Sequence, residues 1–334
     1  MQVRPLRQLV IALGAALLAA TTQAQTKEVT FAHQDMPIPL RTVMESRELE
    51  KATGYKINWR MFGGGGDVIR AMASGDVQVG GAGSSPIAAA AASQGQHIKL
   101  FWILEDIADA EMLIVRNGSG IDSMKDLKGK RVATPFVSTS HHQLMVGLKL
   151  EGVDIKSVNL MNTRPPEIAA AWERGDIDAA FIWDHVLSKI QGNGKAIASS
   201  GSIGRRGYPS FDGLVVNAEW AAKNEAFMVA LVKAVARVDA DYRASCAKWP
   251  ADSPQAKAIA KRTKADVKDV PAVLASFGFP DLAAQASPTW LGGGAAKTLA
   301  DTAAFVKEQG RVAEVKPNYG AFVTTPYVDK AMGK

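Results

Sequence analysis

One pattern occurs twice in the chain, and it constrains the fold more than any other feature. Residues 70–77 read Arg-Ala-Met-Ala-Ser-Gly-Asp-Val, and residues 170–177 read Ala-Ala-Trp-Glu-Arg-Gly-Asp-Ile. In both copies a helical stretch ends at a glycine, which adopts the left-handed conformation at low cost, and an apolar strand follows. One copy alone is a common helix-to-strand turn. Two copies predict two lobes of similar α/β topology, each with a strand that ends at a shared cleft.

The first copy continues into a second helix start. We expect a strand over Asp76–Gly80, and Ser84-Ser85-Pro86 then opens an Ala-rich helix. Serine is a favoured N-cap, and proline at the first helical position has no N–H to leave unpaired. The helix N-terminus therefore directs N–H groups beyond the carboxyl end of the strand, where open α/β sheets bind ligands and where anions are favoured.

A second hydroxyl-rich helix start follows a strand in the other half, at Ser138-Thr139-Ser140-His141. Two such helix starts, one in each lobe, would offer several neutral donors to a tetrahedral oxyanion without any Arg or Lys. A sulfonate suits this arrangement because its oxygens only accept hydrogen bonds. The alternative interpretation is that each serine caps its own helix and contacts no ligand.

Three acidic residues are candidates for contact with a bound cation. Asp212 precedes the strand Gly213–Val216, Glu111 lies in the strand Ala110–Val115, and Asp184 follows Trp183. Each acid could instead be a solvated cap. Trp183 could cover an alkyl chain or lie over an ammonium group, or it could simply pack on its own lobe.

We expect the chain to cross between the lobes at two strands, the one that contains Glu111 and the one that follows Asp212. We therefore assign residues 25–115 and 210–334 to a discontinuous first lobe and residues 116–209 to a second lobe. No low-complexity linker separates them, which favours a double crossover over two domains joined by one tether.

The N-terminal residues have the pattern of a cleaved export signal. Arg4 and Arg7 form a basic region, Leu9–Ala20 is apolar but too short to span a bilayer, and Thr22-Gln23-Ala24 matches a small-x-small cleavage site. We expect residues 1–24 to be removed. The only cysteine is Cys246, so neither a disulfide framework nor a lipidated cysteine is expected, and the mature protein is predicted to be free in the periplasm.

Several function classes are disfavoured by what the sequence contains. The formal net charge of +6 is modest and no basic run is interleaved with aromatic residues, so nucleic acid is not an expected partner. The run Gly63–Gly66 lacks the Lys-Ser/Thr of a nucleotide loop and is interpreted as a turn whose backbone comes close to a ligand, with Asp67 as cap. His141-His142 and Asp184-His185 lack the spacing of a metal site. No hydrolase nucleophile motif is present, so we expect no cofactor, no metal and no catalysis.

At these residues the chain resembles the taurine-binding periplasmic subunits of bacterial ABC importers, within the wider aliphatic sulfonate and nitrate group. The resemblance runs from about Val29 to Tyr327. The phrases that carry it are 70–80 with Gly83-Ser84-Ser85-Pro86, 129–141, Pro165-Pro166 with 171–178, and 305–310. The phrase Pro-Phe-Val-Ser-Thr-Ser-His at 135–141 is the most specific to the taurine branch.

The resemblance implies a fold, a ligand and partners. The fold is the two-lobe periplasmic-binding-protein type II fold, of the α/β class, with the ligand in the cleft between lobes. The implied ligand is taurine or a close aminoalkanesulfonate, delivered by a monomer to an ABC permease and its ATPase. The residues expected at the ligand are Ser84, Ser85, Thr139, Ser140 and His141 for the sulfonate, Asp212 with Glu111 or Asp184 for the ammonium, and Gln34 and Trp183 as walls.

Three departures from the family pattern leave the ligand open. Residues 63–66 are all glycine where a Ser-Gly turn is expected, Arg164 precedes Pro165, and His185 follows Asp184 where proline is usual. The alternatives are another aliphatic sulfonate, a binding protein that reports to a sensor, and an exported enzyme related to pyrimidine synthases. The last depends on a cysteine-rich signature that a single Cys246 does not supply.

Overall fold

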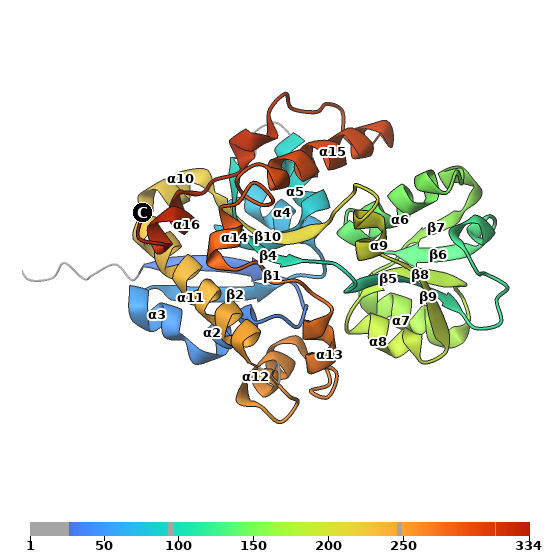
Figure 1. The fold of residues 1–334 in the computed structure, drawn as a ribbon, viewed down its shortest axis with the longest axis horizontal. Helices are drawn as coiled ribbons and strands as arrows, with labels where there is room; N and C mark the ends of the chain where they lie inside the picture. The colour runs from blue at the N-terminus through green and yellow to red at the C-terminus, as the bar shows by residue number, and fades with distance from the viewer. Residues whose placement is uncertain (1–26, 93–96, 246–248, 311) are drawn as a thin grey trace, which may run out of the picture.

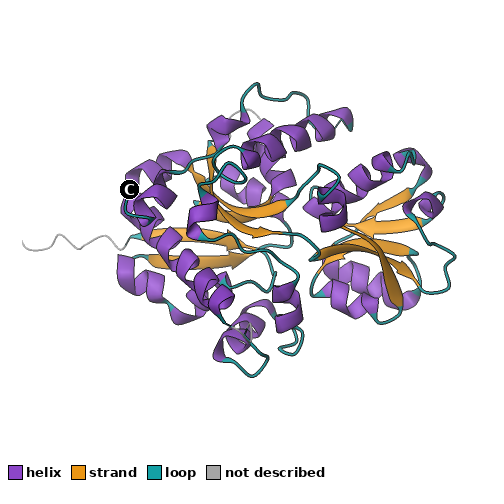
Figure 2. Cartoon of the chain, viewed as in Figure 1, coloured by secondary structure: helices purple, strands orange, loops and turns teal. Residues whose placement is uncertain are grey.

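A computed structural model describes residues 27–92, 97–245, 249–310 and 312–334. The predicted export signal and Cys246 lie outside the described residues. The chain forms two α/β lobes that lie side by side, each with its own sheet flanked by helices (Figures 1 and 2). The predicted α/β two-lobe architecture is confirmed.

The sheet of the first lobe has the strand order β2-β1-β3-β10-β4. Its strands are β1 (Glu28–His33), β2 (Lys56–Met61), β3 (Val79–Gly83), β4 (Ile98–Asp106) and β10 (Phe211–Asn217). Strand β1 is parallel to β2 and β3, whereas β10 runs antiparallel to both of its neighbours, β3 and β4. The long apolar runs of these strands are buried because helices cover both faces of the sheet.

The sheet of the second lobe repeats this arrangement, with the order β7-β6-β8-β5-β9. Its strands are β5 (Glu111–Arg116), β6 (Arg131–Thr134), β7 (Asn159–Asn162), β8 (Ala179–Trp183) and β9 (Gly194–Ser199). Here β6 is parallel to β7 and β8, and β5 is the antiparallel strand, between β8 and β9. Strands β3 and β8, which follow the two Gly-Asp copies, occupy equivalent places in the two sheets.

The Gly-Asp copies act as predicted, with one shift. Gly75 and Gly175 both have positive φ, 85° and 79°, and a helix ends at each. The predicted bounds of the strand after Gly75, 76–80, are wrong by three residues, because β3 begins only at Val79. The hydroxyl of Ser74 donates to the Asp76 carboxylate at 3.0 Å, so residues 74–76 form an exposed turn before the strand.

Helices surround both sheets (Figure 2). In the first lobe they are α2 (Leu40–Ser46), α3 (Glu48–Thr53), α4 (Gly65–Ala73), α5 (Ser84–Ala92), α10 (Ala218–Lys223), α11 (Glu225–Ala244), α12 (Pro254–Thr263), α13 (Val270–Ala275), α14 (Leu282–Gln285), α15 (Gly294–Glu308), η3 (Tyr319–Phe322) and α16 (Pro326–Ala331). In the second lobe they are η1 (Met124–Leu127), α6 (Thr139–Leu150), η2 (Ile155–Ser157), α7 (Pro165–Arg174), α8 (Val186–Gln191) and α9 (Ser200–Gly204). Within the described residues, no helix is both long and apolar enough to cross a membrane.

Residues 40–53, whose apolar spacing is helical throughout, form two helices, because Arg47 adopts a left-handed conformation (φ 54°) between α2 and α3. The glycine run is not a free turn capped by Asp67, because α4 already begins at Gly65. Asp67 lies in its first turn and pairs with Arg70 instead of capping the helix.

The chain passes between the lobes twice, at residues 107–110 between β4 and β5 and at residues 205–210 between α9 and β10. The segment after β10 stays mostly on the first lobe. The C-terminal part of α15 reaches across to the second lobe (Figure 1), where the Phe305 ring packs edge-on against His142 with centroids 5.1 Å apart. The two lobes are therefore in contact through α15 as well as through the two crossing segments.

Arg41 is a charged residue at the centre of the first lobe, with 1% of its surface exposed. Its Nε donates to the carbonyl of Met36 at 3.0 Å and its Nη2 to the carbonyl of Gln34 at 2.7 Å. Burial lowers the pKa of Arg41 to about 10, opposed by the negative charges of Glu105 and Asp35. Arg41 therefore ties the loop after β1 to α2 and partly neutralises buried acids.

Replacement of Arg41 by methionine keeps the apolar stem but leaves two carbonyls and a buried acid without their cation. We expect Arg41→Met to lower the free energy of unfolding by about 3 kcal/mol, measured by urea denaturation. Arg70→Met is the matched control, since the Arg70 side chain is 71% exposed, and it should change stability by less than about 0.5 kcal/mol. Equal effects of the two substitutions would contradict this role for Arg41.

Candidate ligand-binding site

A cavity lies between the lobes where the chain crosses from one to the other. The cavity is narrow, because the lobes lie close together here: its free volume of about 10 Å³ is about the room that one water molecule needs. Its lining residues come from both lobes: Gln34, Met36, Gly65, Gly83, Pro86 and Asp212 from the first, and Glu111, Ser138, Thr139 and Trp183 from the second. Five of them, Gln34, Glu111, Thr139, Trp183 and Asp212, were predicted from the sequence as ligand-binding residues.

Three helix N-termini converge on this cavity. Gly65 is the first residue of α4, Pro86 lies in the first turn of α5, and Ser138 with Thr139 forms the start of α6. Each of these helices has at least nine residues. The N–H groups of a first helical turn have no partner within the helix, and the helix dipole adds positive potential there. None of the lining residues is Lys or Arg, so this part of the cavity attracts an anion without a formal positive charge.

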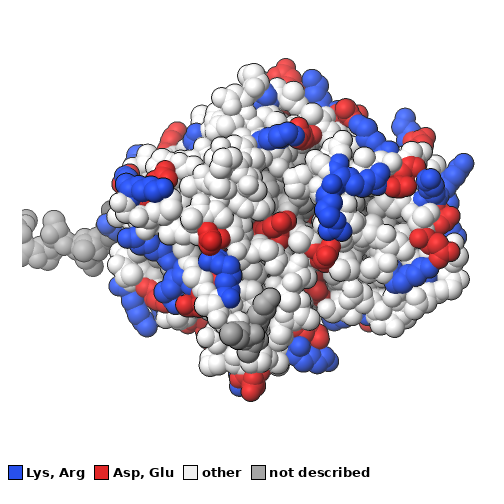
Figure 3. All heavy atoms as spheres, viewed as in Figure 1, with Lys and Arg blue, Asp and Glu red and all other residues white. Residues whose placement is uncertain are grey.

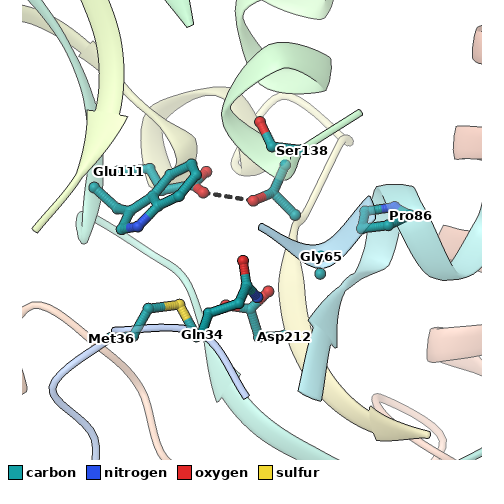
Figure 4. A pocket seen from close by; sticks show the side chains of 10 residues that line it. Gln34, Met36, Gly65, Pro86, Glu111, Ser138 and Asp212 are labelled. Atoms are coloured by element: carbon teal, nitrogen blue, oxygen red, sulfur yellow. Dashed lines mark hydrogen bonds between the residues drawn. The ribbon is translucent and has the colours of Figure 1, made fainter. Parts of the chain in front are cut away.

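Two carboxyl groups face the same cavity from equivalent places in the two sheets. Asp212 lies near the start of antiparallel strand β10 and pairs with Gly83, the last residue of β3. Glu111 begins antiparallel strand β5 and pairs with Trp183, the last residue of β8. Figure 4 shows Glu111 on the side of the cavity opposite Gly65 and Pro86, with Asp212 beside Gln34. The cavity is therefore bipolar: the N-termini of α4 and α5 lie on the side of Gly65 and Pro86, Glu111 lies on the opposite side, and the start of α6 contacts Glu111 through Thr139.

Glu111 is held by hydroxyl groups of its own lobe. Thr139 Oγ1 donates to Oε1 at 2.5 Å, and Ser200 Oγ donates to Oε2 at 2.8 Å. Burial raises the pKa of Glu111 to about 7, and nearby Asp212 adds to the rise, although the bonds from Thr139 and Ser200 oppose it. Ser140 also lies close enough to lower this pKa. A bound cation would favour the ionised carboxylate.

Asp212 has a different environment. It is 4% exposed and pairs in register with Glu105 of β4 on its other side. Burial raises the pKa of Asp212 to about 6. Two acids therefore border the cavity, and a third, Glu105, lies behind Asp212 and was not predicted from the sequence.

Gln34 and Trp183 line the cavity, and their role as walls of the ligand site stays a prediction. The backbone carbonyl of Gln34 accepts hydrogen bonds from Arg41 Nη2, at 2.7 Å, and from His33 Nδ1, at 2.8 Å, when that nitrogen is protonated. These bonds fix the loop, and the Gln34 side chain lines the cavity. Trp183 is 5% exposed, and its indole N–H has no hydrogen-bond partner among the described residues. An unpaired indole donor at the cavity wall could be satisfied by a ligand oxygen.

The other predicted sulfonate residues lie beside the cavity and do not line it. Ser84, Ser85 and Ser140 are at the starts of α5 and α6, and all three are buried. Ser85 and His141 line a neighbouring cavity between α5, α6 and α15, and the His141 ring stacks on Phe136 at 4.3 Å between centroids. The structure shows Ser138, not Ser84 or Ser85, as a serine that caps its helix: its Oγ accepts from His141 N at 3.1 Å.

Asp184 is also placed away from the cavity. Its Oδ1 accepts a hydrogen bond from the backbone N–H of Ser188 at 2.9 Å and another from the Ser188 hydroxyl. These contacts turn the carboxylate toward the start of α8, which is the capping role that the sequence left as the alternative. Burial raises the pKa of Asp184, with the bonds from Ser188 opposing the rise.

Two of the three departures from the family pattern, Arg164 and His185, lie near the boundary of the lobes outside the main cavity. His185 Nδ1 of the second lobe lies 3.6 Å from Asp35 Oδ2 of the first lobe, so a protonated His185 forms an ion pair across the boundary. Arg164 pairs with Glu167 at the start of α7, and both line a separate groove with Asp35.

Gly83 explains how closely the lobes approach at the site. A Cβ atom at Gly83 would lie 2.5 Å from Thr139 Cγ2 of the other lobe and 2.9 Å from Asp212 Oδ1. Any larger residue would therefore hold the lobes apart or displace an acid. The Gly-Ser-Ser-Pro phrase gave the position of this residue, but only the structure shows the contact that requires glycine.

The remaining lining residues were missed for physical reasons. Met36 reaches the cavity through the loop held by Arg41, and nothing in its local sequence indicates this. Gly65 lies in the glycine run that was expected to approach a ligand, which is the signal that could have found it. Among the described residues, no group of three or more His, Cys, Asp or Glu side chains is arranged to hold a metal.

Comparisons with known proteins place the chain among binding proteins. A family model described as NMT1/THI5 like matches residues 51–243. The taurine-binding periplasmic protein of Escherichia coli is 35% identical over 316 residues, which are 95% of this chain and 97% of the relative. A putative aliphatic sulfonates-binding protein of the same organism is 26% identical over 231 residues, 68% of this chain and 71% of the relative.

A solved structure has the same fold. The crystal structure of the periplasmic aliphatic sulphonate binding protein from Escherichia coli superposes with a TM-score of 0.73 at 22% identity, covering 90% of this chain and 92% of that chain. Fold and site thus define a two-lobed solute-binding protein of the periplasmic type. The chain belongs to the NMT1/THI5-like family, in the group of the taurine-binding periplasmic protein. Its curated relatives are binding proteins, which confirms the expectation of binding without catalysis.

The raised pKa of Glu111 predicts a pH-dependent stability. Between pH 4.5 and about 7 the folded protein keeps a proton that the unfolded chain has lost, so this group lowers the free energy of unfolding as pH rises. Glu111→Gln removes that titration. We expect its stability relative to the parent to increase between pH 5 and pH 8, by at most about 3 kcal/mol, in urea denaturation.

Glu308→Gln is the matched control, because the Glu308 side chain is 57% exposed. Its stability relative to the parent should be nearly the same at both pH values. A Glu111→Gln difference that does not change with pH would show that the carboxyl is ionised across the whole range.

Proposed function

We propose that the protein captures taurine, 2-aminoethanesulfonate, in the periplasm and delivers it to the permease and ATPase of an ABC importer. The single observation that carries this proposal is the bipolar cavity. Taurine carries a sulfonate and an ammonium group two carbons apart, and the cavity offers the N-termini of α4 and α5 on the side opposite Glu111.

The anionic end of the ligand is assigned to the N-termini of α4 and α5. They lie around Gly65 and Pro86, across the cavity from Glu111. A sulfonate has three acceptor oxygens and needs no proton donor of its own, so several backbone N–H groups can share it. The absence of Lys and Arg from the lining limits attraction for anions that lack a cationic end.

The ammonium end is assigned to Asp212 and Glu111. Both are buried, 4% exposed each, and burial raises the pKa of both carboxyl groups because it disfavours their charged forms. A bound ammonium group supplies the missing positive charge. A plain alkanesulfonate would leave the carboxyl groups unpaired, which makes taurine the better ligand.

Export and partners are supported by the relatives. The curated relative with 35% identity is a periplasmic protein, and residues 1–24 have the pattern of a signal peptide. We propose that the mature chain acts as a free monomer, whose lobes close on the ligand by a hinge at residues 107–110 and 205–210.

The basic and acidic side chains interspersed over the face in Figure 3 do not form a continuous basic surface there, so they do not favour a nucleic acid partner.

Calorimetry with taurine and ethanesulfonate tests this function, because the two ligands differ only by the amine. The parent protein should prefer taurine strongly. Truncation of one partner of a buried charge pair costs about 2–5 kcal/mol, and Asp212→Asn should remove most of the preference. The four measurements form a double-mutant cycle whose coupling energy reports the contact between Asp212 and the amine.

Asp76→Asn is the matched control, because Asp76 is an exposed acid whose contact is Ser74 in the same turn. It should leave both affinities unchanged. A coupling energy near zero would show that Asp212 does not bind the amine. A parent protein without preference for taurine would favour a plain aliphatic sulfonate, and one that binds neither ligand would exclude the proposed function.

A further inference from the structure

Glu105 is a buried acid that does not line the cavity. It lies near the end of β4, has no exposed surface, and pairs in register with Asp212 on the adjacent strand β10. Neither of its carboxyl oxygens lies within hydrogen-bonding geometry of a donor in the structure, although Asp212 is its strongest electrostatic neighbour. A buried carboxylate without a donor is costly, so its protonation state needs an explanation.

The charges around Glu105 come from three elements. Asp212 of β10 and Asp239 of α11 oppose its ionisation, and Arg41 of α2 favours it. Two of the Arg41 nitrogens donate to the carbonyls of Gln34 and Met36, so this cation is shared with the loop. Burial and the two acids raise the pKa of Glu105 well above its usual range, against the effect of Arg41.

Two adjacent carboxyl groups in a dry site hold one proton between them more easily than they hold two negative charges. Asp212 is the member of the pair that faces the cavity, whereas Glu105 lies on the protein side. A proton on Glu105 can be donated to Asp212 in a charge-assisted O–H···O hydrogen bond, which leaves the other oxygen of Asp212 to accept from a ligand.

We propose that Glu105 is a positioning residue, which stays protonated at neutral pH and donates its hydrogen to Asp212, so that Asp212 alone carries negative charge toward the ligand's ammonium group. This inference rests on the proposed function, in which Asp212 binds the amine of taurine. Glu105 itself does not contact the ligand. It fixes the direction and the charge of the residue that does.

Two substitutions of Glu105 distinguish the effect of its hydrogen-bond donation from the effect of its charge. Glu105→Gln keeps a donor of the same shape, and Glu105→Met keeps the length but removes the donor. At pH 7, Glu105→Gln should bind taurine within about threefold of the parent, and Glu105→Met at least about tenfold more weakly, the scale of one hydrogen bond to a charged group. Ethanesulfonate, which has no amine, should bind both variants nearly equally.

Three outcomes of this titration overturn the proposal. Equal loss of taurine affinity in both variants would mean that the Glu105 charge itself is needed. Unchanged affinity in both would mean that Glu105 does not position Asp212. An equal loss for ethanesulfonate in Glu105→Met would indicate a purely structural defect.

Infrared spectroscopy of the ligand-free protein tests the protonation state without any binding measurement. A carbonyl stretch of a protonated carboxylic acid, shifted by ¹³C-glutamate labelling and absent in Glu105→Gln, supports the proposal at pH 7. No difference in that region between the parent and Glu105→Gln overturns it. This result decides the state of Glu105 even where the parent fails to bind taurine, an outcome that would reject the proposed function separately.

Discussion

The structure depends on one electrostatic arrangement, in which helix N-termini and buried carboxyl groups face each other across a small cavity. The polarity comes from backbone geometry at the starts of α4 and α5 and from the carboxyl groups of Asp212 and Glu111. A helix N-terminus carries roughly half a unit of positive charge and needs no counter-ion, whereas a buried carboxyl group requires a partner. Such a cavity favours a zwitterion over a simple anion or cation.

The rest of each lobe serves to bring these groups together. The repeated sheet order ends β3 and β8 at the cavity and starts β10 and β5 beside them, so each lobe contributes one acid from an equivalent position. Gly83 permits the lobes to approach, since any Cβ there would collide with Thr139. Arg41 supplies the buried cation that fixes the loop with Gln34 and partly balances the acids behind the site.

The sequence allowed the two-lobe fold to be predicted because Gly75 and Gly175 end helices in the same way, and the resemblance added the type of fold. Five residues expected at the ligand line the cavity, because the ends of strands in an α/β sheet meet at one edge, and their contact with a ligand stays a prediction: Glu111, Asp212, Thr139, Gln34 and Trp183. The roles of Ser85 and Asp184 could not be predicted in this way. Whether a polar side chain at a helix start faces the helix or the cleft depends on local geometry, and Asp184 turns toward Ser188.

Glu105 and Arg41 were missed because their importance arises from strand register and packing between distant segments.

The orientation of the bound ligand tests the central claim most directly. A crystal structure of the taurine complex, with anomalous scattering to locate the ligand sulfur, distinguishes the two ends of the molecule. The account predicts the sulfur beside the N-termini of α4 and α5, near Gly65 and Pro86, and the amine at Asp212 and Glu111. A sulfur position against the carboxyl groups, or a ligand bound outside this cavity, would contradict it.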